Sequence, residues 1–199
     1  MNKWKESDSR VTRKNYPERP IRRTRYFKSL PNLKLDFEGR CAYSMAHESS
    51  VGGALEVDHF DASKKTDVIQ SYDNLFPSSR ICNGAKSAKP TKKEIREGKR
   101  FLNPCSEWDY NEQIREDPTS CELQGLTKAA KYHIEHLDLN HPHFLNLRKE
   151  RKKIGRMYRD LAIQMKEGQC FEEFQDVLRH LRKELELAIP TIESIDPDS

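Results

Sequence analysis

The chain has 199 residues, of which 34% are charged and 35% hydrophobic, and its formal net charge at pH 7 is +4. This length suggests one or two domains with a modest core, and so small an excess of positive charge is only weak support for a nucleic-acid partner. The five cysteines have no regular spacing, as in proteins of a reducing cytosol, and no apolar run is long enough for a signal peptide or a membrane span. We therefore expect a soluble, cytoplasmic protein.

Residues 1–35 form a basic arm that is interrupted by prolines. Its positive side chains surround two aromatic residues and are Arg19, Arg22, Arg23, Arg25 and Lys28. Basic residues with aromatic residues between them suit phosphate contacts together with stacking or cation–π contacts. An equal alternative is an arm that wraps the domain through apolar side chains, namely Tyr26, Phe27, Leu30 and Leu33. The two interpretations are compatible.

The next segment, residues 36–105, carries the residues with catalytic chemistry. Asp58 and His59 follow the short run 54–57 and precede a polar stretch, which indicates a strand that ends at this point. Neighbouring side chains on a strand point to opposite faces, so these two converge on one site only where the strand bends or ends. Asp58 offers a carboxylate oxygen and Asn83 an amide oxygen, the ligand types that Mg²⁺ prefers. The neutral imidazole of His59 can take a proton from water near neutral pH.

The surroundings of this segment place Asn83 on a short helix. Ser78 and Ser79 are both candidate N-caps for that helix. Residues 67–72 are expected to form a loop or a short extended piece, with Val68 or Ile69 packed against the segment. Phe37 is expected to pack beneath it.

Residues 86–100 are rich in Lys and Arg. Because this run is contiguous with the candidate site, we expect several of its side chains to contact phosphates, although charge runs are usually solvated helix faces. The expected nucleic-acid-binding residues are Arg80, Lys86, Lys89, Lys92 and Lys93. Phe101 and Leu102, which end the run, are expected in the core.

Residues 106–192 are expected to form a helical C-terminal region, irregular at first over residues 106–124. Apolar stripes at helical spacing predict three helices, which end near Pro142, Gly168 and Pro190. Such stripes are usually core, and part of them can also dock a partner. Residues 193–199 are expected to be a disordered tail.

Four histidines cluster in the third segment and are His133, His136, His141 and His143. A second metal site is one interpretation of this cluster. However, Glu135 and Asp138 fall off the helix face that His133 and His136 share, and no cysteine is near. Surface or capping roles are therefore favoured.

The joint pattern in residues 41–86 resembles the HNH endonucleases, also called ββα-metal fingers. The pattern is Asp58-His59, Asn74-Leu75 and Cys82-Asn83-x-x-Lys86. The final histidine of the family motif is Asn83 here, which makes this an H-N-N variant. The resemblance implies that His59 is the general base and that Asp58 and Asn83 hold Mg²⁺ or Mn²⁺. It also implies that Asn74 fixes the intervening loop by hydrogen bonds and that Lys86 faces a phosphate.

Many members of this family carry two Cys-x-x-Cys pairs that bind a structural zinc ion. Here the corresponding positions read Cys41-x-x-Ser44 and Ser79-x-x-Cys82. Two thiolates and two hydroxyls do not make the strong tetrahedral site that four thiolates make, so no structural zinc is expected. Cys41 and Cys82 are expected to be half-buried, close in space and reduced, since a disulfide requires an oxidising compartment.

The flanking segments carry a second resemblance. They are the basic arm, residues 100–104, and the helix end at residues 134–140 with the Leu147-Arg148 pair after it. Together they are similar to the small HNH proteins of Septu-type anti-phage systems, which also occur in some retrons. The resemblance implies an ATPase partner that controls the nuclease. Energy coupling is not expected from this chain, which shows no nucleotide-binding motif.

The sequence thus predicts a mainly α protein with one small β-hairpin, in which helices wrap a ββα-metal core. The expected function is metal-dependent hydrolysis of phosphodiester bonds, with DNA favoured over RNA, as the effector of an anti-phage complex. The alternative is a catalytically inactive subunit of the same fold that binds nucleic acid or a partner protein. Irregular basic flanks supply no base-reading element, so little sequence specificity is expected.

Overall fold

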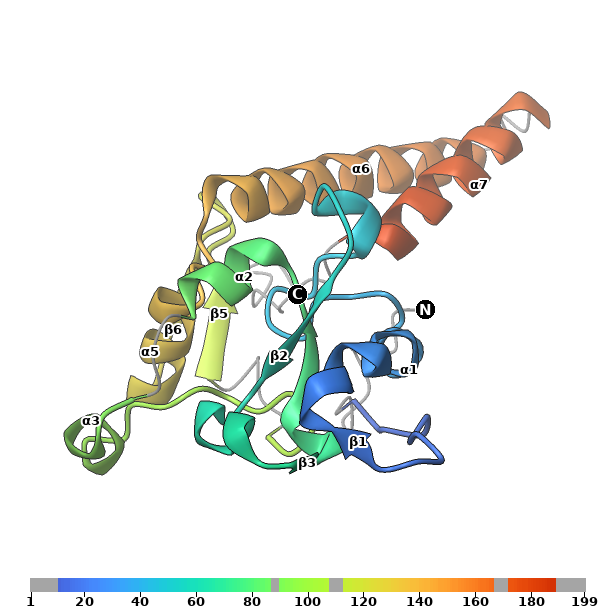
Figure 1. Ribbon diagram of the computed structural model, residues 1–199. Helices are drawn as coiled ribbons and strands as arrows, with labels where there is room; N and C mark the ends of the chain where they lie inside the picture. Colours follow the sequence, from blue (N-terminus) through green and yellow to red (C-terminus); the bar gives the residue numbers. More distant parts are fainter. Residues whose placement is uncertain (1–10, 87–89, 108–112, 167–171, 189–199) are drawn as a thin grey trace.

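The computed structural model describes residues 11–86, 90–107, 113–166 and 172–188 (Figure 1). In chain order the elements are β1 (Ile21–Arg22), the 3₁₀ helix η2 (Arg23–Ser29), α1 (Leu30–Asp36), η3 (Glu48–Ser50), β2 (Glu56–His59), η4 (Ala62–Thr66), β3 (Ile69–Gln70), η5 (Tyr72–Asn74), β4 (Leu75–Ser78), α2 (Arg80–Ala85), α3 (Lys92–Arg96), β5 (Ile114–Glu116), β6 (Leu123–Gly125), α5 (Lys128–His136), α6 (Pro142–Lys166) and α7 (Glu172–Leu187).

The fold is mixed, with about half of the chain helical and the strands in small two-stranded antiparallel sheets. Within the described ranges three such sheets join β1 to β3, β2 to β4 and β5 to β6. The prediction of a mainly α protein with one β-hairpin is therefore correct only in part. The connection between β2 and β4 is also longer than a hairpin turn, because it contains η4, β3 and η5.

The N-terminal arm is fastened to the domain by hydrogen bonds. The Asp36 carboxylate, at the end of α1, accepts from the backbone N–H of Lys14 (2.9 Å). The Arg13 guanidinium donates to the carbonyl oxygens of Tyr72 (2.8 Å) and Leu75 (2.7 Å). The arm is therefore attached to the domain, as in one of the two interpretations of its sequence. The apolar side chains expected to make this attachment do so only in part, since Leu33 is buried but Phe27 is 57% exposed.

Polar side chains begin three of the helices. Ser79 accepts from the N–H of Cys82 (3.3 Å) and caps α2, so the second of the two candidate N-caps is confirmed. Thr91 and Glu94 form a reciprocal capping box at the start of α3. Thr127 caps α5 in the same way as Ser79 caps α2. Each cap satisfies backbone N–H groups that a helix leaves without partners in its first turn.

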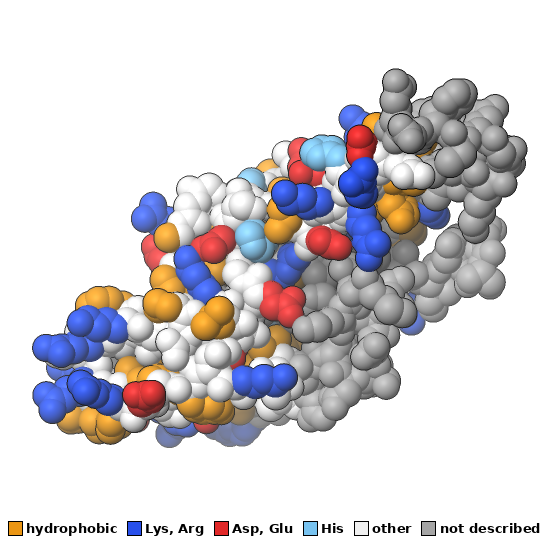
Figure 2. Space-filling model, turned by 90° about the vertical axis from the view of Figure 1, so that its right-hand side faces the viewer, with side chains coloured by type: hydrophobic (Ala, Val, Ile, Leu, Met, Phe, Trp, Pro, Cys, Tyr) orange, Lys and Arg blue, Asp and Glu red, His pale blue; other side chains and the backbone are white. Residues whose placement is uncertain are grey.

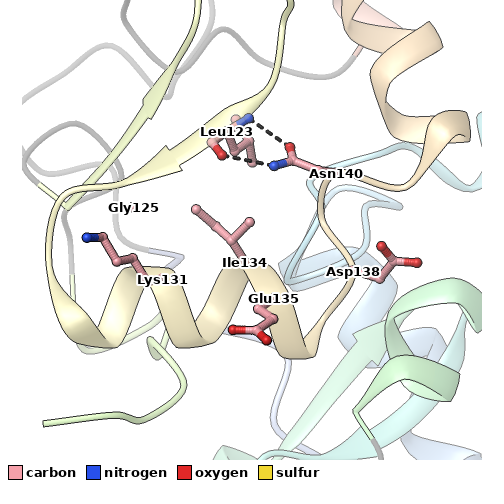
Figure 3. A pocket seen from close by; sticks show the side chains of 7 residues that line it. All are labelled: Leu123, Gly125, Lys131, Ile134, Glu135, Asp138 and Asn140. Carbon is pink, nitrogen blue, oxygen red and sulfur yellow. Dashed lines mark hydrogen bonds between the residues drawn. The ribbon is translucent and has the colours of Figure 1, made fainter.

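Residues 113–125 contain two strands, where an irregular segment was expected. β5 and β6 pair with each other and lie beside α5 (Figure 1). A Cβ atom at Gly125 would lie 2.4 Å from the backbone nitrogen of Lys131, so only glycine allows β6 to approach the helix this closely. A hollow of about 400 Å³ remains beside this contact. There Asn140 accepts from the N–H of Leu123 (2.7 Å) and donates to its carbonyl oxygen (2.9 Å) (Figure 3).

α6 and α7 lie side by side and project from the rest of the molecule (Figure 1). The Arg40 guanidinium donates to the carbonyl oxygens of Ala188 (2.9 Å) and Glu186, and so satisfies acceptors that the end of α7 leaves open. Leu181 is buried but Met157 is 47% exposed, so part of the predicted apolar stripes faces solvent. The predicted helix ends at Gly168 and Pro190 lie outside the described residues. None of the described helices is long and apolar enough to cross a membrane.

A large hydrophobic core joins the arm to the start of α6. Phe37 belongs to it and packs edge-on against Phe76, with 5.8 Å between ring centroids, as expected of a residue beneath the candidate site. Phe101 and Leu102 are also buried, which confirms the prediction for both.

The short extended piece expected within residues 67–72 is present as β3, but its packing differs from the prediction. Val68 and Ile69 are 78% and 53% exposed, so neither is packed away as expected. The buried residue of this short strand is Gln70. The physical reason is the pairing of β3 with β1, since alternation along a strand turns Gln70 inward when Ile69 faces solvent.

Candidate catalytic and metal-binding site

β2, β4 and α2 form one unit near the centre of the molecule (Figure 1). In the antiparallel register of the two strands, Asp58 pairs with Phe76 and His59 with Leu75. The chain then turns at Ser79 into α2, which packs against β2. The unit thus brings the end of one strand next to the helix that carries Asn83.

The carboxylates of Glu56 and Asp58 lie on one face of β2, because side chains two positions apart along a strand point the same way. Glu56 Oε2 accepts from the amide nitrogen of Asn83 (2.7 Å), and Glu56 Oε1 accepts from Arg80 Nε (3.0 Å). Asp58 Oδ2 accepts from Lys86, the residue after α2. Both carboxylates therefore face the helix of Asn83, and the contact with Glu56 uses the nitrogen of the Asn83 amide rather than its oxygen.

Lys86 is turned into the protein. Its side chain is 5% exposed, and its ammonium forms an ion pair with Asp58. The same nitrogen donates to the carbonyl oxygen of His59 (2.7 Å) and to the hydroxyl of Tyr43 (3.3 Å). Burial lowers the pKa of Lys86, and the charge of Asp58 acts against that shift. In this structure the protein itself supplies the negative charge opposite Lys86, and the expectation that Lys86 faces a phosphate stays a prediction.

His59 ends β2 and its side chain points away from the face of Asp58, as strand alternation requires. It is 5% exposed, with the Tyr26 ring edge-on at 4.7 Å between centroids. Nε2 lies 2.7 Å from Gln70 Oε1. The Gln70 amide nitrogen donates to the carbonyl of Asp67. This bond directs the Gln70 oxygen toward His59, so Nε2 carries the proton and Nδ1 the lone pair.

The environment of His59 keeps its imidazole neutral. Burial lowers the pKa of His59, while the hydrogen bond to Gln70 and the charge of Asp58 act in the opposite direction. Because the net shift is downward from a usual value near ~6.5, the neutral form is the main one at neutral pH. This is the protonation state that a general base needs.

Asn74 closes the long loop that follows His59. Its side-chain oxygen accepts from the N–H of Asp61 (2.8 Å), and its amide nitrogen donates to the Asp61 carbonyl (3.1 Å). Its own carbonyl accepts from the N–H of Phe60 (2.9 Å). Both ends of the loop are therefore fixed to each other, which is the geometry expected of Asn74.

The donor set of this unit suits a hard divalent cation. Glu56, Asp58 and Asn83 offer carboxylate and amide oxygens, the ligand types of Mg²⁺ and Mn²⁺. A cation already lies there, because the Lys86 ammonium contacts the carboxylate of Asp58 and two further oxygens. In the described part of the chain, no group of three or more His, Cys, Asp and Glu side chains is placed to bind a metal. Water and phosphate oxygens would therefore have to complete the shell of an ion held by Asp58 and Asn83.

Cys41 and Cys82 are completely buried, where half-buried thiols were expected, because the large core encloses them. Their closeness in space is confirmed, since the two thiols hydrogen-bond each other. Burial acts to raise the pKa of Cys41, but hydrogen bonds with Cys82 and Ser44 outweigh it and lower the pKa to about 5. Ser79 Oγ accepts from the N–H of Cys82 (3.3 Å). All four positions of the two short motifs are thus gathered at one place, and both cysteines are free thiols.

The expected phosphate-binding residues do not form one surface. The Arg80 side chain is 85% exposed and pairs with Glu56. Lys92 and Lys93 are exposed in the first turn of α3. α3 lies at the edge of the molecule, away from α2 (Figure 1). Lys89 lies outside the described residues.

The clustered histidines have separate structural partners. His133 is fully buried, where a surface or capping role was expected, and its Nδ1 accepts from the N–H of Leu102 (3.0 Å). His136 stacks on a tyrosine ring of its own helix, with 3.8 Å between centroids. His143 Nε2 lies 2.6 Å from the carbonyl oxygen of Ser50. His141 Nδ1 accepts from the N–H of His143 (3.1 Å), a local contact at the start of α6. Within the described residues, these histidines are not grouped with other side chains in a second metal centre.

Several residues of the site were missed from the sequence. Period-two alternation would have identified Glu56, because it lies two positions before Asp58 on the same strand. Tyr43, Tyr26 and Gln70 reach the site from other parts of the chain. No local pattern around these three residues marks them.

Comparisons with known proteins identify no relative of this chain. No protein-family model matches the sequence, no curated protein matches it, and no solved structure matches it. Its function is therefore proposed from its own residues, their geometry and the resemblance of their pattern.

Proposed function

We propose that this chain is a metal-dependent endonuclease of the HNH type, which hydrolyses phosphodiester bonds in nucleic acid, with DNA favoured over RNA. The observation that carries the proposal is the arrangement of β2, β4 and α2. It presents a neutral, oriented imidazole at His59 on one face of β2 and, on the opposite face, the carboxylate of Asp58 directed toward the helix of Asn83. The loop closed by Asn74 adds support, because the motif resemblance implies this role.

His59 is the base in this proposal. Its Nδ1 lone pair takes a proton from a water molecule whose oxygen attacks phosphorus. A new bond forms between that oxygen and phosphorus as the bond from phosphorus to the departing oxygen breaks. Gln70 acts as a positioning residue, because its contact with Nε2 fixes the ring and its tautomer.

Asp58 and Asn83 are the residues that would hold Mg²⁺ or Mn²⁺, with Glu56 beside them. When bound, such an ion neutralises charge on the phosphate and on the departing oxygen. An ion held by Asp58 would supply the positive charge that Lys86 supplies to this carboxylate in the structure, and two cations on one carboxylate repel each other. Lys86 would then be available to contact a phosphate, the role that the motif resemblance implies.

The proposal extends to a partner. The resemblance of the flanking segments to Septu-type proteins suggests an ATPase subunit that controls the nuclease. Apolar side chains on the projecting helices support a docking role, since Met157, Ile163 and Val177 are 47%, 56% and 46% exposed.

A nuclease assay tests the proposal. Wild type and His59→Ala are incubated with supercoiled plasmid, single-stranded DNA and RNA, each with Mg²⁺ or EDTA. We expect cleavage by wild type only with Mg²⁺ and a loss on the order of 10²–10⁴ in rate for His59→Ala, as for removal of a general base. Circular dichroism checks that the variant is folded. Normal cleavage by His59→Ala would refute the assignment of the base.

A catalytically inactive binding subunit is the second candidate. The 5% exposure of His59 and the pairing of Asp58 with Lys86 are the observations in its favour, because both close the site. Nucleic-acid binding without cleavage under every metal condition, also in the presence of the partner ATPase, would support this candidate.

A further inference from the structure

A basic cavity is lined by residues of the N-terminal arm, including part of η2, and by Ile69 of β3. Its volume is about 590 Å³. Four of its lining residues are cationic and are Arg19, Arg22, Arg25 and Lys28. None of the described residues that line it is acidic. In Figure 2, Lys and Arg side chains gather with hydrophobic ones at the lower end of the face shown.

The 3₁₀ geometry of η2 explains how the cations reach one cavity. A 3₁₀ helix has three residues per turn, so side chains three positions apart lie above one another, about 6 Å apart along the axis. Arg22 is the N-cap of η2, and Arg25 and Lys28 follow at this spacing. In the set offset by one position, Tyr26 faces the protein and contacts His59, while the buried Ser29 also lines the cavity. The helix thus presents a row of positive charges on one face.

These charges are not neutralised by the described part of the protein. The four cationic side chains are exposed, and none forms an ion pair with another described residue. Elsewhere an acidic partner is present, as for Lys34 with Glu48 (2.5 Å). Gathering like charges in one concave surface is unfavourable unless an anion binds there.

The cavity is connected to the candidate catalytic residues through short contacts. Tyr26, in the middle of η2, lies against His59. β1, which ends at Arg22, pairs with β3, whose Gln70 contacts His59. Only one layer of residues, which includes Tyr26 and Gln70, therefore separates the row of charges from His59, the proposed base. Beside the row, Phe27 is 57% exposed, which suits stacking of an unpaired base.

We propose that this cavity binds successive backbone phosphates of a nucleic-acid strand that is single-stranded where it crosses η2, next to the bond that is cut. The inference rests on the proposed function and adds a substrate subsite to it. A repeated row of charges fits a polyanion with a repeated charge better than one small anion. The same chemistry would also accept a free nucleotide, and the test separates these two sources.

The test compares two double variants that remove the same charges. Arg25→Ala with Lys28→Ala changes the cavity, and Lys153→Ala with Arg156→Ala changes two exposed residues of α6 at the same spacing. Binding of labelled single-stranded DNA and RNA oligonucleotides is measured by fluorescence anisotropy over a salt series, with EDTA to prevent cleavage. We expect the cavity variant to weaken binding by on the order of tenfold and to reduce the salt slope by about 1.4, since each phosphate contact on a single strand contributes about 0.7. The α6 variant should change neither.

Equal weakening in both double variants would overturn the inference, because the effect would then follow from net charge alone. Competition with a nucleoside monophosphate provides the second arm. If the monophosphate binds as tightly as the oligonucleotide and loses the same factor in the cavity variant, the site is a nucleotide site and the strand assignment is wrong.

A small phosphodiester separates this inference from the proposed function. Bis(p-nitrophenyl) phosphate is too short to span the site of cleavage and the cavity. We expect wild type and the cavity variant to hydrolyse it at the same rate, with only oligonucleotide binding impaired. If oligonucleotide binding depends on the cavity but neither substrate is hydrolysed, the phosphate subsite is supported and the proposed nuclease activity is refuted.

Discussion

In the proposed mechanism, the Asp58 carboxylate binds two different cations in turn, the Lys86 ammonium and a divalent metal ion. Its side chain is 12% exposed and carries the Lys86 ammonium in the structure, with the Tyr43 hydroxyl as a second donor. Removal of one partner of a buried ion pair leaves an uncompensated charge, which is strongly destabilising unless another group replaces it. A divalent ion is such a group. If the proposed metal ion binds here, Lys86 therefore stabilises Asp58 when the ion is not bound and competes with it for the same carboxylate.

Lys86→Met tests this competition at the scale of one residue, because it removes the charge and keeps an unbranched side chain. We expect Mn²⁺ to bind on the order of tenfold more tightly, which corresponds to about 1.4 kcal/mol, while cleavage becomes slower because the phosphate loses its ammonium partner. Electron paramagnetic resonance titration measures the affinity.

Lys183→Met, an exposed position on α7, is the control and should change neither quantity. Unchanged Mn²⁺ affinity in Lys86→Met would show that the ion pair with Asp58 does not compete with metal binding.

At the scale of elements, the β2–α2 unit was more predictable than its surroundings. Local sequence signals predict this unit, since a polar stretch ends the strand and Ser79 caps the helix. β5 and β6 escaped prediction because each has only three residues and their pairing depends on contacts with α5, including the close approach at Gly125. Gln70 and Tyr26 escaped for a similar reason, because they meet His59 only through the pairing of β1 with β3.

The junction between the loop at Cys41 and the start of α2 allows a prediction about zinc. Cys41, Ser44, Ser79 and Cys82 are gathered there as two short motifs. Ser44→Cys with Ser79→Cys completes four thiols, and we expect this variant to bind one Zn²⁺ ion and to melt at a higher temperature when loaded. Zinc content after dialysis, measured by mass spectrometry, checks the stoichiometry.

The single variant Ser44→Cys is the matched control, and it should retain much less zinc. If the double variant also retains none, the four side chains do not have the tetrahedral geometry that their contacts indicate.

At the scale of the whole molecule, buried polar side chains attach the helices to the core. Arg148 of α6 is 1% exposed and donates to the carbonyl oxygens of Cys121 (2.7 Å) and Leu139 (3.0 Å). Arg40 does the same for the end of α7, and His133 of α5 accepts from Leu102. The helices were visible in the sequence as apolar stripes. The hydrogen bonds that attach them could not be predicted from the sequence, because each joins segments far apart in the chain.

His133 makes the stability of the molecule dependent on pH. Burial lowers the pKa of His133 to about 3, whereas an unfolded histidine has a pKa near ~6.5. At pH values above the unfolded pKa, neither the folded nor the unfolded state binds the proton, so the neutral His133 makes its full contribution to the free energy of unfolding. As the pH falls below it, only the unfolded state gains a proton, so the free energy of unfolding decreases by about 1.4 kcal/mol per pH unit toward the folded pKa.

His133→Asn should remove this dependence, since an amide oxygen can accept from the N–H of Leu102 and does not titrate. In urea denaturation, we expect the free energy of unfolding of wild type to fall by about 1.6 kcal/mol more than that of the variant between pH 6.5 and pH 5. The control is His180→Asn, at an exposed position of α7. Its free energy of unfolding should fall by as much as that of wild type over the same pH range. Equal losses in wild type and His133→Asn would contradict the neutral, buried state of His133.

The most direct test of the central claim is a Mn²⁺ titration of wild type and of the Asp58→Ala, Asn83→Ala double variant. Asp58 of β2 and Asn83 of α2 are proposed to hold the ion of a nuclease site together. We expect saturable binding of one Mn²⁺ ion by wild type, weakened at least on the order of tenfold in the double variant. If wild type binds Mn²⁺ no better than the double variant, the metal site is absent and a binding protein without catalysis is the better account.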